Sequence, residues 1–82
     1  MDYDGKSQTI FEFCQGEGIG RSSYYYLKAI GRAPDEMVMG DIIRISPEAK
    51  RRWRERMERE PVKGSLRELA LAAKAARETE AA

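Results

Sequence analysis

Apolar residues first recur at helical spacing after a polar, glycine-containing start of the chain. One helical face carries Ile10, Phe13 and Cys14. Ser7 or Thr9 can cap a helix with this face, and the glycines on either side of Glu17 are a stop signal. The pattern therefore predicts a loose tail over residues 1–6 and a first helix that ends within residues 16–18.

A second helix is predicted over residues 21–30, because Tyr24 and Leu27 share a helical face and Gly31 follows as a stop signal. A turn of three or four residues that contains glycine separates the two predicted helices. This spacing is typical of a helix-turn-helix.

Residues 32–35 form a connector, because its proline disfavours a helical conformation in the residue before it. The pattern changes beyond this connector. Two short apolar runs follow, at residues 37–39 and 42–45. Gly40 and Asp41 separate these runs, which predicts a hairpin with a two-residue loop.

Two more helix starts follow the hairpin. Ser46 and Pro47 predict a third helix that ends before Pro61, and Ser65 opens a fourth helix with a capping box. The apolar stripe of the third helix consists of Ala49, Trp53 and Met57. The stripe of the fourth consists of Leu66, Leu69, Ala70 and Ala73. Two interpretations of this last stripe stay open: self-association of the chain, and packing against the same domain.

Together these elements predict a mainly α-helical fold with a small β-hairpin. We expect a winged helix-turn-helix over residues 7–60, made of a helix-turn-helix, a two-stranded wing and a third helix. A C-terminal helix within residues 61–82 is the candidate self-association element. A chain of 82 residues is enough for one small domain.

The residue types exclude several kinds of chemistry. The chain has no histidine and a single cysteine, Cys14, so histidine-dependent nucleophiles, zinc sites with histidine and an internal disulfide are ruled out. We expect no enzyme, no catalytic or metal site, no cofactor and no small-molecule substrate. No apolar run approaches the roughly 18 residues that span a bilayer. We therefore expect a soluble cytoplasmic protein with no membrane partner.

The formal net charge of +1 at first disfavours nucleic acid as a partner, but the basic residues are unevenly distributed. Residues 21–34 hold three basic and no acidic residues, and residues 44–59 hold seven basic and three acidic residues. The basic run over residues 50–56 has a solvated helix face as its competing interpretation. The concentration of positive charge on these segments keeps DNA as a candidate partner.

In a helix-turn-helix, the start of the second helix lies nearest to base edges in the major groove. Arginine can donate two hydrogen bonds to guanine, serine can donate or accept, and tyrosine offers a hydroxyl to phosphate. The candidate DNA-contact residues are Arg21, Ser22, Ser23, Tyr25, Tyr26, Lys28, Arg32 and Arg44.

Packing competes with DNA contact for some of these residues. We expect Tyr24 in the core, Tyr26 on the polar side of the helix, and Tyr25 in an intermediate position. Arg44 either contacts DNA from the hairpin or pairs with Asp41 as an exposed strand residue.

Four segments carry a family resemblance: the turn and second helix at residues 18–25, the Gly-Arg-Ala-Pro connector at residues 31–34, the hairpin over residues 37–44, and the Ile-Ser-Pro-Glu helix start at residues 45–48 with Trp53. In this order they resemble the AlpA/excisionase-like family of winged helix-turn-helix proteins, relatives of the MerR DNA-binding domain. The resemblance covers residues 8–56.

The resemblance implies a role for each matching residue. The family's groove-facing positions correspond to Arg21, Ser22, Ser23 and Tyr26. Tyr25 corresponds to a partly buried tyrosine, and Arg44 to the basic residue of the wing. Gly20 stands where the family has a serine or threonine cap, and Tyr26 where arginine or lysine is common.

We therefore expect a small sequence-specific DNA-binding protein of a phage or other mobile element, in the cytoplasm of a bacterial or phage-infected cell. Its expected role is that of an excisionase-type recombination directionality factor or a transcriptional regulator. It would bind double-stranded DNA as a homo-oligomer or cooperative assembly, with an integrase as a candidate partner. Two alternatives stay open: the DNA-recognition domain of a phage terminase small subunit, and a protein-interaction module such as an antirepressor or host-takeover factor.

Overall fold

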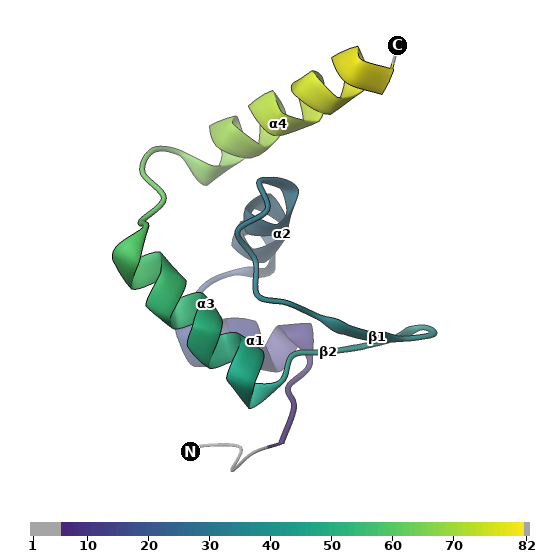
Figure 1. Ribbon diagram of the computed structural model, residues 1–82, viewed down its shortest axis with the longest axis vertical. Helices are drawn as coiled ribbons and strands as arrows, with labels where there is room; N and C mark the ends of the chain where they lie inside the picture. Colours follow the sequence, from purple (N-terminus) through teal and green to yellow (C-terminus); the bar gives the residue numbers. More distant parts are fainter. Residues whose placement is uncertain (1–5, 82) are drawn as a thin grey trace.

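The computed structural model describes residues 6–81, so the predicted tail at residues 1–6 lies, apart from Lys6, outside the described residues. The elements in chain order are α1 (Ile10–Glu17), α2 (Arg21–Ala29), β1 (Met37–Met39), β2 (Ile42–Arg44), α3 (Pro47–Arg59) and α4 (Leu66–Ala81). Figure 1 shows α1, α2 and α3 grouped around one core, with the hairpin projecting from it. The predicted mainly helical fold with one small antiparallel hairpin is confirmed.

Local sequence signals explain both ends of α1. Thr9, rather than Ser7, is the cap: its Oγ1 accepts from the Glu12 N–H at 3.0 Å, while Glu12 Oε1 accepts from the Thr9 N–H at 2.9 Å. These two bonds form a capping box. Gly18 ends the helix in the left-handed conformation, with φ 72°, which favours glycine. Ile19 and Gly20 complete the turn before α2 begins at Arg21.

Three aromatic rings connect α1, α2 and α3. The Phe13 ring lies edge-on to Tyr24 at 5.8 Å and to Trp53 at 5.0 Å between ring centroids. Phe13 and Tyr24 are fully buried together with Ile45, which follows β2. Such edge-on pairs contribute about 0.5–1.5 kcal/mol each beyond the burial of apolar area. Tyr24 and Trp53 are therefore core residues, as the periodicity predicted.

The hairpin is attached to the body at its base. β1 and β2 pair in the register Met37–Arg44, Val38–Ile43 and Met39–Ile42. Ile45 and Gln8 then exchange two backbone hydrogen bonds, both 2.8 Å long, which fasten the end of β2 to the residues before α1. Gly40 occupies the loop with φ 66°, as a tight two-residue turn requires.

The last two helices also begin where their capping signals predicted. Ser46 Oγ accepts from the Ala49 N–H at 3.0 Å and Pro47 is the first residue of α3. Ser65 Oγ accepts from the Glu68 N–H at 3.3 Å at the start of α4. No helix among the described residues is long and apolar enough to cross a membrane.

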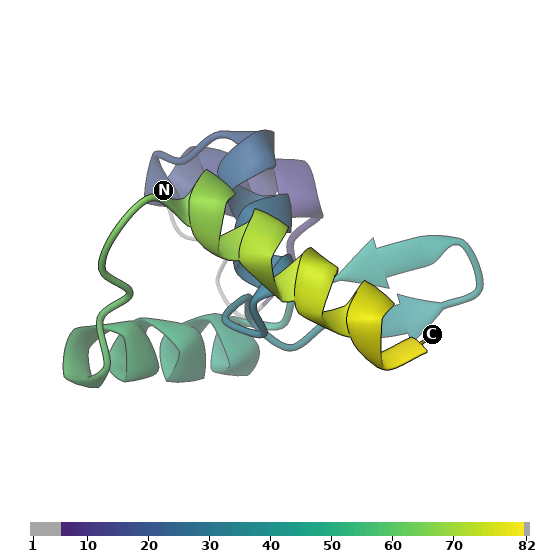
Figure 2. The same cartoon turned by 90° about the horizontal axis from the view of Figure 1, so that it is seen from above.

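Helix α4 packs against α2, and both views show the two helices side by side (Figures 1 and 2). Within its apolar stripe Ala70 is buried, and Leu66, Leu69 and Ala73 are half-buried. Arg77 Nη1 also donates to the Ala29 carbonyl at the end of α2, at 2.9 Å. Of the two interpretations of the stripe, the structure supports packing against the same domain.

Candidate nucleic-acid interface

Helix α2 presents one exposed polar face. It consists of four exposed residues, Arg21, Ser22, Tyr25 and Lys28, and is called the α2 face below. The opposite side of the helix carries the buried Tyr24 and Leu27. Because α1 and α3 hold that buried side through the aromatic core, the α2 face is fixed on a rigid support.

The start of α2 is open to an external partner. Gly20 is the N-terminal cap and supplies no side-chain hydrogen bond to the first turn. Arg21 follows it, exposed, with no hydrogen bond or ion pair to any described residue. A cation at a helix N-terminus is unfavourable by itself, since the helix dipole is positive there. An anionic partner would relieve this unfavourable placement.

The two outer tyrosines of α2 differ from expectation. Tyr25 is 47% exposed, whereas Tyr26 is half-buried. The family resemblance implied a partly buried Tyr25 and a groove-facing Tyr26. The exposure of the two side chains shows the reverse order, so this expectation is wrong. Ser23, Tyr26 and Ile30 recur at helical spacing and are all half-buried, and Ile30 packs against the core.

Lys28 shares an acidic partner with the core. Its Nζ lies 3.1 Å from Glu36 Oε1, and the Tyr24 hydroxyl donates to Glu36 Oε2. Burial, followed by the hydrogen bond to Glu36 and the charge of that residue, raises the pKa of Tyr24 far above its usual range. Glu36 thus satisfies the one polar atom that Tyr24 brings into the core. Nothing in the periodicity pointed to Glu36, which lies between the connector and β1.

Cys14 lies in the core near the start of α2. Burial raises the pKa of its thiol, while the nearby positive charge of Arg21 acts in the opposite direction. A buried thiol with a raised pKa is a weak nucleophile. Cys14 therefore acts as a small core residue, as its position on the Ile10 face predicted.

Arg32 is held within the protein. One of its Nη atoms donates to the Glu60 carbonyl and contacts the Met57 sulfur at 3.6 Å. The Arg32 carbonyl accepts from the Trp53 indole N–H at 2.7 Å. Arg32 therefore fastens the connector to α3, and its guanidinium already has intramolecular partners.

Arg44 also has an intramolecular partner, and it is not Asp41. Its Nε donates to Ser7 Oγ at 3.1 Å and its Nη2 donates to the Ser7 carbonyl at 2.8 Å. The alternative in which Arg44 pairs with Asp41 is thus replaced by a contact with the residues before α1. Ser7, a candidate helix cap in the sequence, instead anchors the base of the hairpin.

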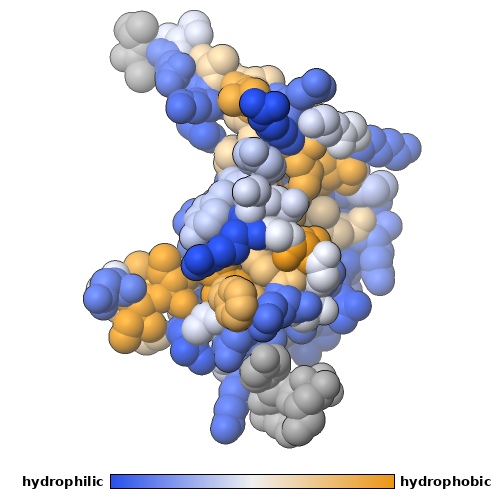
Figure 3. Space-filling model, turned by 180° about the vertical axis from the view of Figure 1, so that it is seen from behind, coloured by the Kyte–Doolittle hydropathy of each residue, from blue (hydrophilic) through white to orange (hydrophobic). Residues whose placement is uncertain are grey.

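Apart from Arg44, which corresponds to the basic wing position of the family, the hairpin is apolar. Residues 37–43 contain no basic side chain, and their one exposed acid in the loop is Asp41. Four apolar residues of the hairpin are exposed to solvent: Met37 at 40%, Val38 at 65%, Met39 at 52% and Ile42 at 52%. Figure 3 shows them as a hydrophobic patch on the projecting arm of the molecule. This surface is poorly suited to contact phosphate groups.

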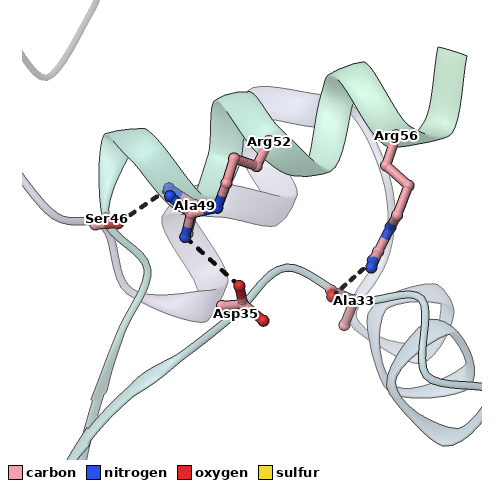
Figure 4. Close-up of polar contacts among 6 residues, drawn as sticks. All are labelled: Ala33, Asp35, Ser46, Ala49, Arg52 and Arg56. Atoms are coloured by element: carbon pink, nitrogen blue, oxygen red, sulfur yellow. Dashed lines mark hydrogen bonds and ion pairs between the residues drawn. The ribbon is translucent and has the colours of Figure 1, made fainter. Parts of the chain in front are cut away.

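Four of the six basic residues of α3 have polar partners in other parts of the chain. Lys50 and Arg54 both pair with Glu17 at the end of α1, at 3.7 and 3.8 Å. Figure 4 shows two further contacts with the connector: Arg52 with Asp35 at 3.5 Å, and Arg56 with the Ala33 carbonyl at 3.2 Å. Among the α3 arginines, Arg51 and Arg59 alone have no hydrogen bond or ion pair to a described residue.

An open pocket of about 410 Å³ lies along the contact between α3 and the connector. Arg52, Arg56 and Arg59 line it, but so do the carboxylates of Asp35 and Glu55. The acidic neighbours prevent a strong concentration of positive charge there. Within residues 6–81 no group of three or more acidic or cysteine side chains is placed to hold a metal ion.

Comparison with known proteins identifies no relative of this chain. No family model, curated protein or solved structure matches this chain. Its function is therefore inferred from the geometry of the chain itself.

Proposed function

We propose that the chain is a small sequence-specific DNA-binding protein of a phage or mobile element, acting as an excisionase-type recombination directionality factor or a transcriptional regulator. The α2 face is the observation that carries this proposal. It is an exposed polar helix face with an unpaired arginine at its start, preceded by the three-residue turn of residues 18–20 and held by a buried aromatic core.

The proposed mechanism is binding without bond chemistry. The α2 face enters the major groove, which is about 12 Å wide and admits one helix. Arg21 donates two hydrogen bonds to a guanine edge, and Ser22 and Tyr25 contact neighbouring base edges or phosphate oxygens. α2 lies between α4 and the hairpin, and the molecular surface is hollowed on that side (Figures 1 and 3).

The internal ion pairs set how strongly salt affects binding. Arg21 has no partner in the described chain, and Lys28 is exposed although it pairs with Glu36. With about two phosphate-neutralising charges per copy, the logarithm of the binding constant falls with the logarithm of salt concentration with a slope of about −2. Such a copy has low non-specific affinity, so its specificity depends on base contacts and on more than one bound copy.

The test is selection from a pool of randomised DNA duplexes by the purified protein. The proposal predicts a short enriched sequence, and retention that weakens between about 50 and 200 mM salt with the shallow slope given above. Folded protein that retains no duplex at 50 mM salt would refute the proposal. A slope as steep as about −4.5 would instead assign binding to the five α3 arginines.

A further inference from the structure

The hairpin carries an apolar surface that nothing in the described chain covers. Met37, Met39 and Ile42 lie on one side of the two-stranded sheet, and Val38 projects from the other side at 65% exposure. An isolated two-stranded hairpin has marginal stability in water, and exposed contiguous apolar patches usually mark interaction sites. The hairpin therefore has the features of an interaction site.

We propose that β1 is a self-association edge, at which β1 of a second copy of this chain adds antiparallel to form a four-stranded sheet. This inference goes beyond the proposed DNA contact and does not depend on it, since the α2 face takes no part.

The hydrogen-bond pattern fixes the direction of the β1 backbone. Ile45 exchanges both of its backbone bonds with Gln8, so its N–H and C=O point away from β1. Backbone groups two residues apart on a strand point to the same edge, so those of Ile43 also point away from β1. Val38 is the partner of Ile43, so this pair is of the non-hydrogen-bonded type. The Val38 N–H and C=O are therefore directed to the outer edge of β1.

The two edges of this sheet differ in what lies beside them. The end of β2 is followed by the Gln8–Ile45 bridge, whereas no described strand pairs with the outer edge of β1. Natural proteins usually protect such an edge with charged residues, proline or a covering element. β1, with the sequence Met-Val-Met, has no charged residue and no proline.

A second copy fits because the edge is complementary to itself. Antiparallel pairing about a twofold axis at Val38 places the two valines opposite each other, with two backbone hydrogen bonds between them. Met37 then lies opposite Met39 of the second copy, on both sides of the axis. The paired segment brings together apolar side chains and no like charges.

Charges lie beyond the ends of the paired strands. In this register Asp35 lies opposite Asp41 of the second copy, which alone would be repulsive. Arg52 is ion-paired to Asp35 at 3.5 Å and brings a positive charge to that position. The hairpin projects from the helical body in both ribbon views, so the bodies need not collide (Figures 1 and 2).

The α4 stripe, the other apolar surface considered for self-association, already packs against α2. The β1 edge is small, so the expected dimer is weak, with a Kd on the order of 10 µM, because interfaces below about 1,200 Å² are typical of transient complexes.

The test is sedimentation equilibrium of the wild-type chain and three variants over about 1–300 µM, a range that brackets the expected Kd. The wild type is expected to change from monomer to dimer. Val38→Lys is expected to weaken dimerisation at least about tenfold, since it places like charges opposite each other at the axis. Val38→Pro removes the outward N–H while keeping the hairpin bonds, because proline is tolerated where a strand N–H faces solvent; it should have a similar effect.

Leu71→Lys is the matched control, because Leu71 is 55% exposed on α4, outside the hairpin. It should leave the dimerisation constant unchanged, and circular dichroism should show all three variants folded. A wild type that stays monomeric throughout the range would overturn the proposal, as would a dimer that Leu71→Lys weakens and Val38→Lys does not. A monomer whose β1 amides respond to an added extended apolar peptide would assign the edge to another protein and equally overturn the proposal.

Discussion

The α2 face and the hairpin are the two most exposed functional candidates, and their chemistry is opposite. The α2 face has polar side chains and an arginine without a partner among the described residues, at the start of a helix that has no side-chain cap. The hairpin has apolar side chains and an outer strand, β1, that pairs with no described strand other than β2. The first arrangement suits an anionic partner with hydrogen-bonding edges, and the second suits another strand. One small domain can thus hold two surfaces that differ in the partner they select.

A second contrast explains why the count of charges along the chain is a poor guide to partners. The α3 segment has more basic residues than α2, yet Lys50, Arg52 and Arg54 are paired with acids from other elements. Arg21 of α2 has no such acid among the described residues. A count of basic residues therefore overstates the positive charge that α3 offers to a partner, although Arg51 and Arg59 are unpaired among the described residues.

The largest expected effect comes from the core that supports both surfaces. Phe13→Ala removes the ring that contacts Tyr24 and Trp53, and costs about 3–5 kcal/mol of stability. A domain of this size has roughly that much in total, so the variant is expected to be unfolded and to lose DNA binding and self-association together. Urea denaturation followed by the fluorescence of Trp53 measures this. A Phe13→Ala protein that stays folded with a loss below about 1 kcal/mol would show that the aromatic core is not the common support.

The next effect separates the α2 face from α3. Arg21→Ala is expected to weaken binding to the selected duplex by about 1–3 kcal/mol and to lower the salt slope by about 1. Arg51→Ala is the matched control, since Arg51 is also exposed and unpaired among the described residues but lies on α3. Fluorescence anisotropy at several salt concentrations gives both quantities. Equal losses in the two variants would contradict a specific role for the α2 face.

A smaller effect is expected at the turn that orients α2. Gly18 has φ 72°, and nothing lies within 4 Å of the position that an alanine methyl group would take there. Gly18→Ala therefore costs about 1–2 kcal/mol through backbone conformation alone. Gly20→Ala has no positive φ to maintain and is the matched control. Thermal unfolding by circular dichroism measures the difference. If the two substitutions lower stability equally, the left-handed conformation at Gly18 is not the reason that the turn needs glycine there.

The smallest effects are expected from Val38→Lys, on the stability of the chain and on its affinity for a duplex with one binding site. Because Val38 is 65% exposed, its replacement is expected to change the free energy of unfolding by less than about 0.5 kcal/mol. Binding to a duplex with one site should also be unchanged, whereas cooperativity on a duplex with two sites should fall. A loss of single-site affinity as large as that of Arg21→Ala would mean that the hairpin itself contacts DNA.

The sequence predicted the elements well because their signals are local. Thr9, Gly18, Ser46 and Pro47 define helix ends through contacts within a few residues, and Gly40 with Asp41 defines the hairpin loop. Phe13, Tyr24 and Trp53 were placed correctly by periodicity alone.

The details of the candidate site depended on contacts between distant segments. The Ser7–Arg44 and Tyr24–Glu36 bonds join residues 37 and 12 positions apart. The half-buried state of Tyr26 was not signalled by the pattern of residues within α2. Periodicity gives the face of a helix on which a residue lies, but not which other element packs against that face.

Contact between the α2 face and DNA underlies the proposed function, and amide chemical-shift mapping tests it most directly. The measurement is a titration of the isotope-labelled wild-type chain with the duplex most enriched in the selection. We expect the largest shifts at Arg21, Ser22 and Tyr25, with smaller shifts in the hairpin and in α3. Largest shifts within residues 50–59 or 37–44, with the α2 amides unmoved, would contradict this contact.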